Sequence, residues 1–168
     1  MFCSCEGSSN FLVMFLFRFP VQALTAYYGL CELGNLKSGQ TVLVHSAAGG
    51  VGILAIQILQ KKNATVFGTV SSKEKADFLV SKFGLQPHQI IVRGDAPNFE
   101  AQLTEALQKS GKTGINIAFD SLGGEYFFPT YNKLHLGGRH VFFGSGSFMP
   151  SGSLGTLPFP PPSILCCC

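Results

Sequence analysis

The chain has 168 residues, of which 46% are hydrophobic and only 12% are charged, and its formal net charge is +3. This length suits one domain, and the charged share is about half of the usual quarter, which excludes a charge-rich disordered chain. So small a positive excess, with no nucleic-acid-binding motif, also excludes a nucleic-acid-binding protein of the basic-patch type.

Two end segments differ in composition from the rest of the chain. Residues 1–19 are rich in Cys, Ser and Phe, and the apolar run from Phe11 to Phe17 is far shorter than the ~20 residues that span a bilayer. It also lacks the basic region of a signal peptide. Residues 147–168 carry no charge and five prolines. We therefore predict an unrelated N-terminal segment at 1–19, a folded domain at 20–146 and a Pro-rich irregular tail at 147–168.

Helical and strand patterns alternate between these segments. Apolar residues at helical spacing predict a first helix at 21–33, which Gly34 ends. The following predicted elements are, in chain order, a strand at 41–46, a helix at 50–61, a strand at 64–69, a helix at 72–83, a strand at 90–92, a helix at 99–110, a strand at 115–120, a short helix at 125–134 and a strand at 139–143. This alternation predicts an α/β fold, a Rossmann-type doubly wound parallel sheet that is truncated and has irregular ends.

The turn after the first predicted strand carries a glycine pattern. Residues 46–52 read Ser-Ala-Ala-Gly-Gly-Val-Gly, so Gly49 and Gly52 occupy the second and third glycine positions of G-x-G-x-x-G, and Ala47 the first. A glycine at 49 lets a pyrophosphate approach the backbone, and one at 52 lets the helix pack closely. The helix N-terminus adds free N–H groups and a positive dipole. The pattern predicts dinucleotide binding; a purely structural glycine turn is the alternative.

The residues after the second predicted strand indicate which dinucleotide is bound. An NAD site places Asp or Glu about 20 residues past the glycine pattern. Here the segment 68–75 offers hydroxyl groups and two lysines, while Glu74 falls inside the following helix. Hydroxyl and ammonium donors suit a 2′-phosphate, so NADPH is favoured over NADH. Lys75 is the candidate phosphate ligand, whereas Lys73 is better explained as a solvated helix residue.

Three segments, 24–30, 33–52 and 120–124, resemble the medium-chain dehydrogenase/reductase superfamily. The most similar branch is the zinc-free quinone oxidoreductases, which includes the enoyl reductase domains of polyketide synthases, and the resemblance covers residues 20–145. It implies an oxidoreductase that passes hydride from NADPH to a quinone or an α,β-unsaturated carbonyl, with no metal. The cofactor-binding residues that it implies are Thr25, Ala48, Gly49, Gly50, Val51, Gly52, Ser71, Lys75, Gly144 and Ser145.

Within that set, the resemblance gives each part of the cofactor its ligands. Residues 49–52 would hold the pyrophosphate, Ser71 and Lys75 the 2′-phosphate, and Thr25 would lie near the nicotinamide. Gly144 and Ser145 would end the fifth strand beside the cofactor.

The chain also departs from the family's pattern. Residues 1–19 stand where relatives carry a GroES-like domain, a sixth strand is not expected, and Val92 replaces a tyrosine. No general acid can be named, so the catalytic residues stay unknown. The chain would be the incomplete cofactor-binding domain of a reductase; the alternatives are a non-catalytic nucleotide-binding or interaction module and an inactive fragment. An unpaired outer edge of the fifth strand, at 141–143, predicts a homodimer or aggregates.

The cysteines and histidines form no recognisable metal or disulfide pattern. Five of the six cysteines lie at the chain ends and no C-x-x-C pair exists, so we expect a reduced, cytoplasmic protein. The final three cysteines do not form a prenylation motif. His88, His135 and His140 are scattered, and Cys31 is expected to be a small buried residue.

Two further polar residues stand at strand ends. His45 lies in the first predicted strand, beside the glycine pattern, and we interpret it as a packed strand histidine rather than a catalytic one. Asp120 ends the fourth predicted strand, where a carboxylate could orient the next loop or cap a turn.

Overall fold

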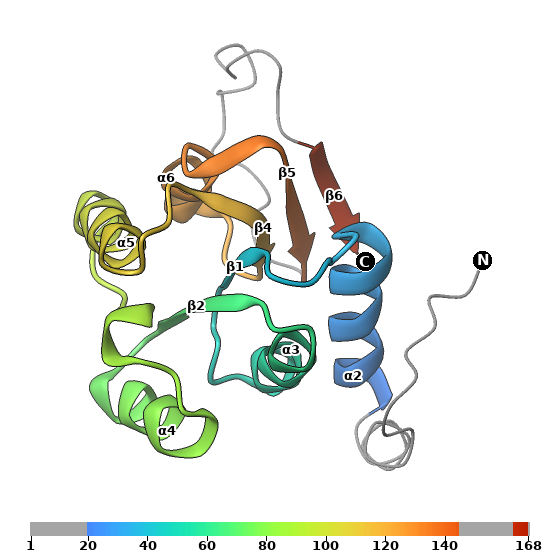
Figure 1. Ribbon diagram of the computed structural model, residues 1–168, viewed down its shortest axis with the longest axis horizontal. Helices are drawn as coiled ribbons and strands as arrows, with labels where there is room; N and C mark the ends of the chain where they lie inside the picture. Colours follow the sequence, from blue (N-terminus) through green and yellow to red (C-terminus); the bar gives the residue numbers. More distant parts are fainter. Residues whose placement is uncertain (1–19, 145–162, 168) are drawn as a thin grey trace.

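One parallel sheet of six strands, in the order β3-β2-β1-β4-β5-β6, organises the protein (Figure 1). The computed structural model describes residues 20–144 and 163–167. The strands are β1 Thr41–Val44, β2 Thr65–Val70, β3 Ile90–Val92, β4 Ile115–Asp120, β5 Leu134–Phe143 and β6 Ser163–Cys167. Strands β2 and β3 are added on one side of β1, and β4, β5 and β6 on the other. The order of strand addition therefore reverses at β1, as in a doubly wound fold. The predicted α/β class is confirmed.

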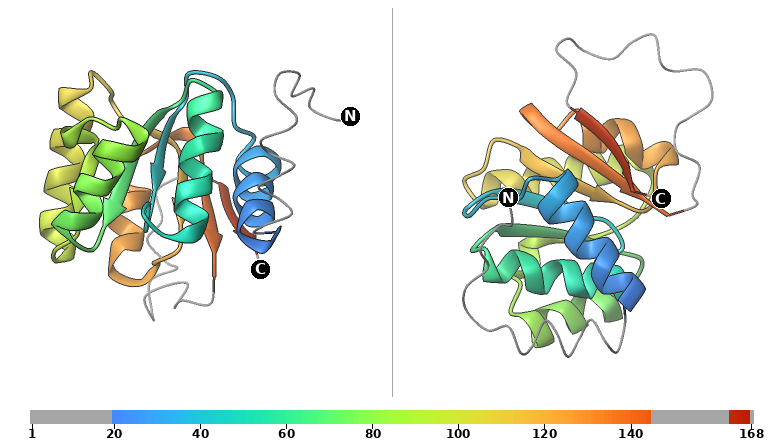
Figure 2. Two further views of the ribbon diagram at one scale, coloured as in Figure 1. Left: turned by 90° about the horizontal axis from the view of Figure 1, so that it is seen from below. Right: turned by 90° about the vertical axis from the view of Figure 1, so that its right-hand side faces the viewer.

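Helices cover both faces of this sheet (Figure 2). They are α2 Pro20–Tyr27, η1 Tyr28–Leu33, α3 Gly50–Lys61, α4 Lys73–Phe83, η2 Pro87–Gln89, α5 Ala96–Lys109, η3 Gly124–Tyr126 and α6 Phe127–Tyr131. Their ends have local causes. Gly84 ends α4 in the left-handed conformation at φ 65°, and Pro97 lies in the first turn of α5, where its missing N–H costs nothing.

Two apolar layers hold the helices against the sheet. On one face, α2, α3 and α4 bury residues such as Ala26, Ile56 and Leu79 against the strands. On the other face, α5 buries Phe99 and Leu103. Residues of the central strands belong to both layers, so the strands from which the turns start are packed on both faces.

The helix predicted at 21–33 is divided into α2 and a π-helix, η1. The N–H of Gly34 donates to the carbonyl of Gly29, five residues earlier, at 2.8 Å. Gly29 packs directly on Phe119 of β4, and a Cβ atom at Gly29 would lie 2.5 Å from that ring. The apolar spacing of the sequence predicted the helix and not the change to a wider turn.

The structure corrects the expectation for the outer edge of β5. Residues Arg139 to Phe143 pair in parallel with Ser163 to Cys167, so a sixth strand is present and the edge is covered. Strand β6 also lies within the tail that we expected to be irregular. Proline cannot donate to a strand ladder, and the pairing begins at Ser163, directly after Pro162, the last proline of the tail. A homodimer is no longer predicted from an open β5 edge.

In the part of the chain covered by the structure, no helix has both the length and the apolar character needed to cross a membrane.

Candidate functional site

A small open pocket lies at the carboxyl ends of β1, β2 and β3. Its lining comes from the end of β2, from the turns that follow these three strands and from the first turn of α4. It consists of Ser46, Ala48, Gly49, Val70, Ser71, Lys75 and Arg93. Ligands of doubly wound sheets bind at this edge. The structure therefore brings together four of the predicted site residues, Ala48, Gly49, Ser71 and Lys75.

The first wall of the pocket is the turn between β1 and α3. Gly49 is the N-cap of α3, and the first N–H groups of a helix have no carbonyl partner within it, so they are available to an anion. A Cβ atom at Gly52 would lie 2.5 Å from the carbonyl oxygen of Ser46 and 2.6 Å from that of Ala47. The close packing predicted for Gly52 is thus present, and Gly50 and Val51 lie beside it in the first turn of α3.

The second wall is formed by the start of α4. The ammonium group of Lys75 donates to the hydroxyl of Ser71 at 2.9 Å, and both side chains are exposed. Glu74 is not part of the pocket lining. A hydrogen bond from Ser72, together with a backbone N–H, lowers the pKa of Glu74, which keeps this carboxylate engaged at the helix start.

Arg93 supplies the third wall and is not among the residues predicted from the sequence. It follows β3 directly, and its backbone N–H donates to the carbonyl of Val70 at 2.9 Å. Its half-buried side chain lines the pocket with Lys75, and its Nε atom is buried without a hydrogen-bond partner in the described structure. The available signal was a basic residue right after the third strand.

Two further predicted site residues, Thr25 and Gly144, lie outside the pocket lining. The hydroxyl of Thr25 donates to the carbonyl of Val21 within α2, at 2.8 Å. Gly144 follows β5 with φ at 98°, a conformation that favours glycine. Ser145 falls outside the described residues.

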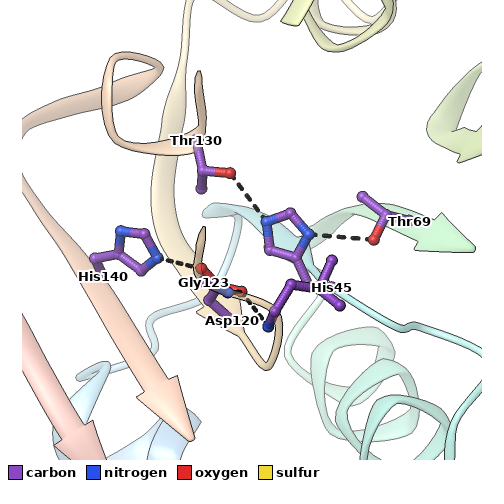
Figure 3. A network of polar contacts seen from close by, with 7 residues as sticks. His45, Thr69, Asp120, Gly123, Thr130 and His140 are labelled. Atoms are coloured by element: carbon purple, nitrogen blue, oxygen red, sulfur yellow. Dashed lines mark hydrogen bonds and ion pairs between the residues drawn. The ribbon is translucent and has the colours of Figure 1, made fainter. Parts of the chain in front are cut away.

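A buried polar network stands behind the pocket, at the ends of β1 and β4 (Figure 3). The His45 ring is fully buried, with Nδ1 3.2 Å from Thr69 Oγ1 and Nε2 3.0 Å from Thr130 Oγ1. Burial lowers the pKa of His45 to about 4, so the ring is neutral at pH 7. His45 is therefore a packed, hydrogen-bonded histidine, as we interpreted it.

Asp120 forms the second part of this network. One carboxylate oxygen accepts from the backbone N–H groups of Leu122 at 2.7 Å and Gly123 at 3.2 Å, and the other accepts from Nε2 of His140 at 2.8 Å. Burial opposes ionisation of Asp120, but His45, His140 and the Leu122 amide together outweigh it and lower its pKa below the usual range. The predicted role of Asp120 in shaping the next turn is confirmed.

Neither histidine belongs to a metal site in the described parts of the chain, where no three His, Cys, Asp or Glu side chains gather around a common point. The His140 ring instead stacks on Phe127 of α6, with ring centres 4.9 Å apart.

Comparisons with known proteins agree with this arrangement. The sequence pattern of the family described as "Zinc-binding dehydrogenase" matches residues 50–166. The "Reducing polyketide synthase BOA9" of Botryotinia fuckeliana is 38% identical over 136 residues, which is 81% of this chain and 6% of that synthase. The chain thus spans only a small part of this curated relative.

Two solved structures are similar in fold. The nucleotide-binding subdomain of the enoylreductase domain of PpsC from Mycobacterium tuberculosis is 32% identical, with a TM-score of 0.65 over 76% of this chain and 67% of that one. CurA in complex with NADPH from Vibrio vulnificus is 25% identical, with a TM-score of 0.68 over 88% of this chain and 45% of that one.

Proposed function

Because the chain belongs to the medium-chain dehydrogenase/reductase superfamily, as a nucleotide-binding subdomain of the enoyl reductase type, we propose that it binds NADPH for the reduction of an α,β-unsaturated carbonyl. Support for this acceptor class, rather than a quinone, comes from relatives whose names refer to enoyl reductases and reducing polyketide synthases.

The observation that carries the proposal is the composition of the pocket. The glycine turn, which has no side chain at Gly49, lines the same pocket as two cations, Lys75 and Arg93. The buried Nε of Arg93 has no partner in the described structure, so a ligand that accepts a hydrogen bond there would complete its bonding. Arginine binds phosphate in a forked geometry and lysine as a point charge. These donors fit the 2′-phosphate that distinguishes NADPH from NADH.

Each part of the site would then have one task. The first turn of α3 would hold the pyrophosphate through backbone N–H groups, and Ser71, Lys75 and Arg93 would hold the 2′-phosphate. NADPH, when bound, supplies the hydride. This chain's own residues bind and orient the nucleotide, and we assign none of them a proton-transfer role.

Titration calorimetry of the full chain with NADPH and with NADH tests the proposal. We expect NADPH to bind about ten- to a hundred-fold more tightly, the effect of one hydrogen bond to a charged group. Arg93→Ala should narrow this preference. Lys73→Ala is the matched control, because Lys73 is exposed at the same edge and does not line the pocket. Equal affinities of the unmodified chain for the two nucleotides would refute the choice of NADPH.

A further inference from the structure

The phosphate-binding turn begins with a backbone conformation that needs support from outside the turn. Ser46 has φ at 51°, in the left-handed region, although it is not a glycine. Such a conformation is unfavourable for a residue with a side chain and persists only where surrounding contacts enforce it. Ser46 also lines the pocket. The contacts that hold Ser46 therefore decide the shape of one pocket wall.

Thr69, the fifth residue of β2, provides these contacts with both its side chain and its backbone. The N–H of Ser46 donates to Thr69 Oγ1 at 3.2 Å, and the N–H of Ala47 donates to the Thr69 carbonyl at 2.9 Å. The turn then closes when the N–H of Gly49 donates to the carbonyl of Ser46 at 2.8 Å. Thr69 Oγ1 accepts this hydrogen bond through a lone pair, and a second partner for the hydroxyl keeps its proton and its remaining lone pair turned away from the Ser46 N–H.

The imidazole of His45 fixes that hydroxyl. Its Nδ1 lies 3.2 Å from Thr69 Oγ1, and its Nε2 lies 3.0 Å from Thr130 Oγ1 on α6, so the ring bridges two hydroxyls in either neutral tautomer (Figure 3). The lowered pKa of His45 agrees with a neutral ring. Phe99 of α5 packs against the ring with centres 5.6 Å apart. The ring is thus held from β2, α5 and α6 at once.

We propose that His45 is a positioning residue for the phosphate-binding turn: it acts through Thr69 to hold Ser46 and Ala47 in the conformation that shapes the pocket. Neither His45 nor Thr69 contributes to the pocket lining. The inference rests on the proposed NADPH binding for its affinity readout, but the conformation of the turn can be measured without any nucleotide.

Thr69→Val and Thr69→Ser are the first pair of variants. Valine keeps the shape of the side chain without the hydroxyl, whereas serine keeps the hydroxyl. Thr41→Val is the matched control, because Thr41 is a buried threonine at the opposite end of β1. We expect Thr69→Val to weaken NADPH binding about three- to ten-fold, the effect of one net hydrogen bond. Thr69→Ser should restore the affinity, and Thr41→Val should leave it unchanged.

Two probes separate positioning from a general loss of structure. Binding of 2′-AMP, which has the 2′-phosphate but no pyrophosphate, should be unaffected in Thr69→Val, because its expected ligands are Ser71, Lys75 and Arg93. Hydrogen exchange at the amides of Ser46 and Ala47 should become faster in Thr69→Val and not in Thr41→Val.

The role of His45 itself is tested by His45→Phe and by the double variant His45→Phe/Thr69→Val. If His45 acts through Thr69, the double variant should bind NADPH no more weakly than Thr69→Val alone. Additive losses would overturn the inference, as would unchanged exchange at Ser46 and Ala47 in both single variants. If the unmodified chain does not bind NADPH but the amides of Ser46 and Ala47 exchange faster in the variants, the proposed function is refuted and the positioning role is still supported. If His45→Phe does not fold, His45→Gln replaces it. The comparison of Thr69→Val with Thr69→Ser then still tests whether the Thr69 hydroxyl holds the turn.

Discussion

The carboxylate of Asp120 and the imidazole of His140 form a pair from which water is excluded, with Oδ2 2.8 Å from Nε2 and both side chains 0% exposed. The pair joins β4 to β5. Because the other carboxylate oxygen accepts from Leu122 and Gly123, the same pair also fixes the turn after β4. This turn follows the strand next to β1, at the edge of the sheet where the pocket lies.

Loss of the Asp120 carboxylate should destabilise the protein strongly. Asp120→Ala would leave His140 and two backbone N–H groups without an acceptor in a buried site, and breaking a buried pair in this way costs about 3–5 kcal/mol. Asp120→Asn keeps one acceptor oxygen for Leu122 and should lose less. Urea unfolding measures both. The exposed Asp77 of α4 provides the control, since Asp77→Ala should change the free energy of unfolding by only about 0.5 kcal/mol or less.

Stability should depend on pH through His45. The folded chain lowers the pKa of His45 from 6.5 to about 4, mainly by burial and also through Arg93 and His140, while Asp120 opposes the shift. Between these pH values the unfolded chain binds a proton that the folded chain does not, so stability falls as the pH decreases from 6.5 to 4. The expected loss is about 3 kcal/mol at pH 4.

Unfolding free energies measured across this range should therefore have a flatter pH dependence in His45→Gln. Asp120 contributes mainly at lower pH, because its pKa is lowered in the folded chain and its stabilisation is lost chiefly below its ordinary value of 3.8. An unchanged pH profile in His45→Gln would contradict the assignment to His45.

The two glycines of the phosphate-binding turn should respond differently to substitution. At Gly49 a Cβ atom would lie 3.1 Å from the Ser46 carbonyl oxygen, a contact that a small adjustment relieves. Gly49→Asp should therefore fold, and its charge should abolish nucleotide binding. At Gly52 the nearest backbone atom would lie 2.5 Å away, so Gly52→Val should lower both binding and the melting temperature. NADPH binding by Gly49→Asp with the affinity of the parent would show that the pyrophosphate is held elsewhere.

Lys75 should affect one nucleotide and not the other. The ammonium group of Lys75, held 2.9 Å from Ser71 Oγ, would contact the 2′-phosphate of NADPH, which NADH lacks. A hydrogen bond to a charged group contributes about 1.5–3 kcal/mol, so Lys75→Ala should weaken NADPH about ten- to a hundred-fold. NADH affinity should barely change. If calorimetry shows equal losses for both nucleotides, Lys75 is only a solvated helix residue.

The sequence predicted the features that depend on local patterns. The order of strands and helices, the stop of α4 at Gly84 and the close approach at Gly52 all follow from spacing and from the properties of glycine. The change from α2 to η1 was not predictable in this way. It depends on the contact between Gly29 and Phe119, which lie on distant parts of the chain.

Only the part of the site that depends on local sequence patterns was predicted. Lys75 lies shortly after β2, which pairs with β1 and completes the βαβ unit of the glycine turn, whereas Arg93 joins the pocket only because β3 pairs with β2. Strand β6 was missed because five residues after a proline run carry little strand signal by themselves. Its pairing depends on the edge that β5 offers, which only the assembled sheet provides.

The hydrogen bond between His45 and Thr130 joins residues 85 positions apart in the chain. During synthesis the glycine turn therefore leaves the ribosome well before the helix that immobilises its histidine. Closing so long a loop is entropically costly and belongs to the non-local contacts that slow folding. We expect the turn to become rigid late in folding, after α6 has docked on the sheet. Nucleotide capture would then report the completion of folding.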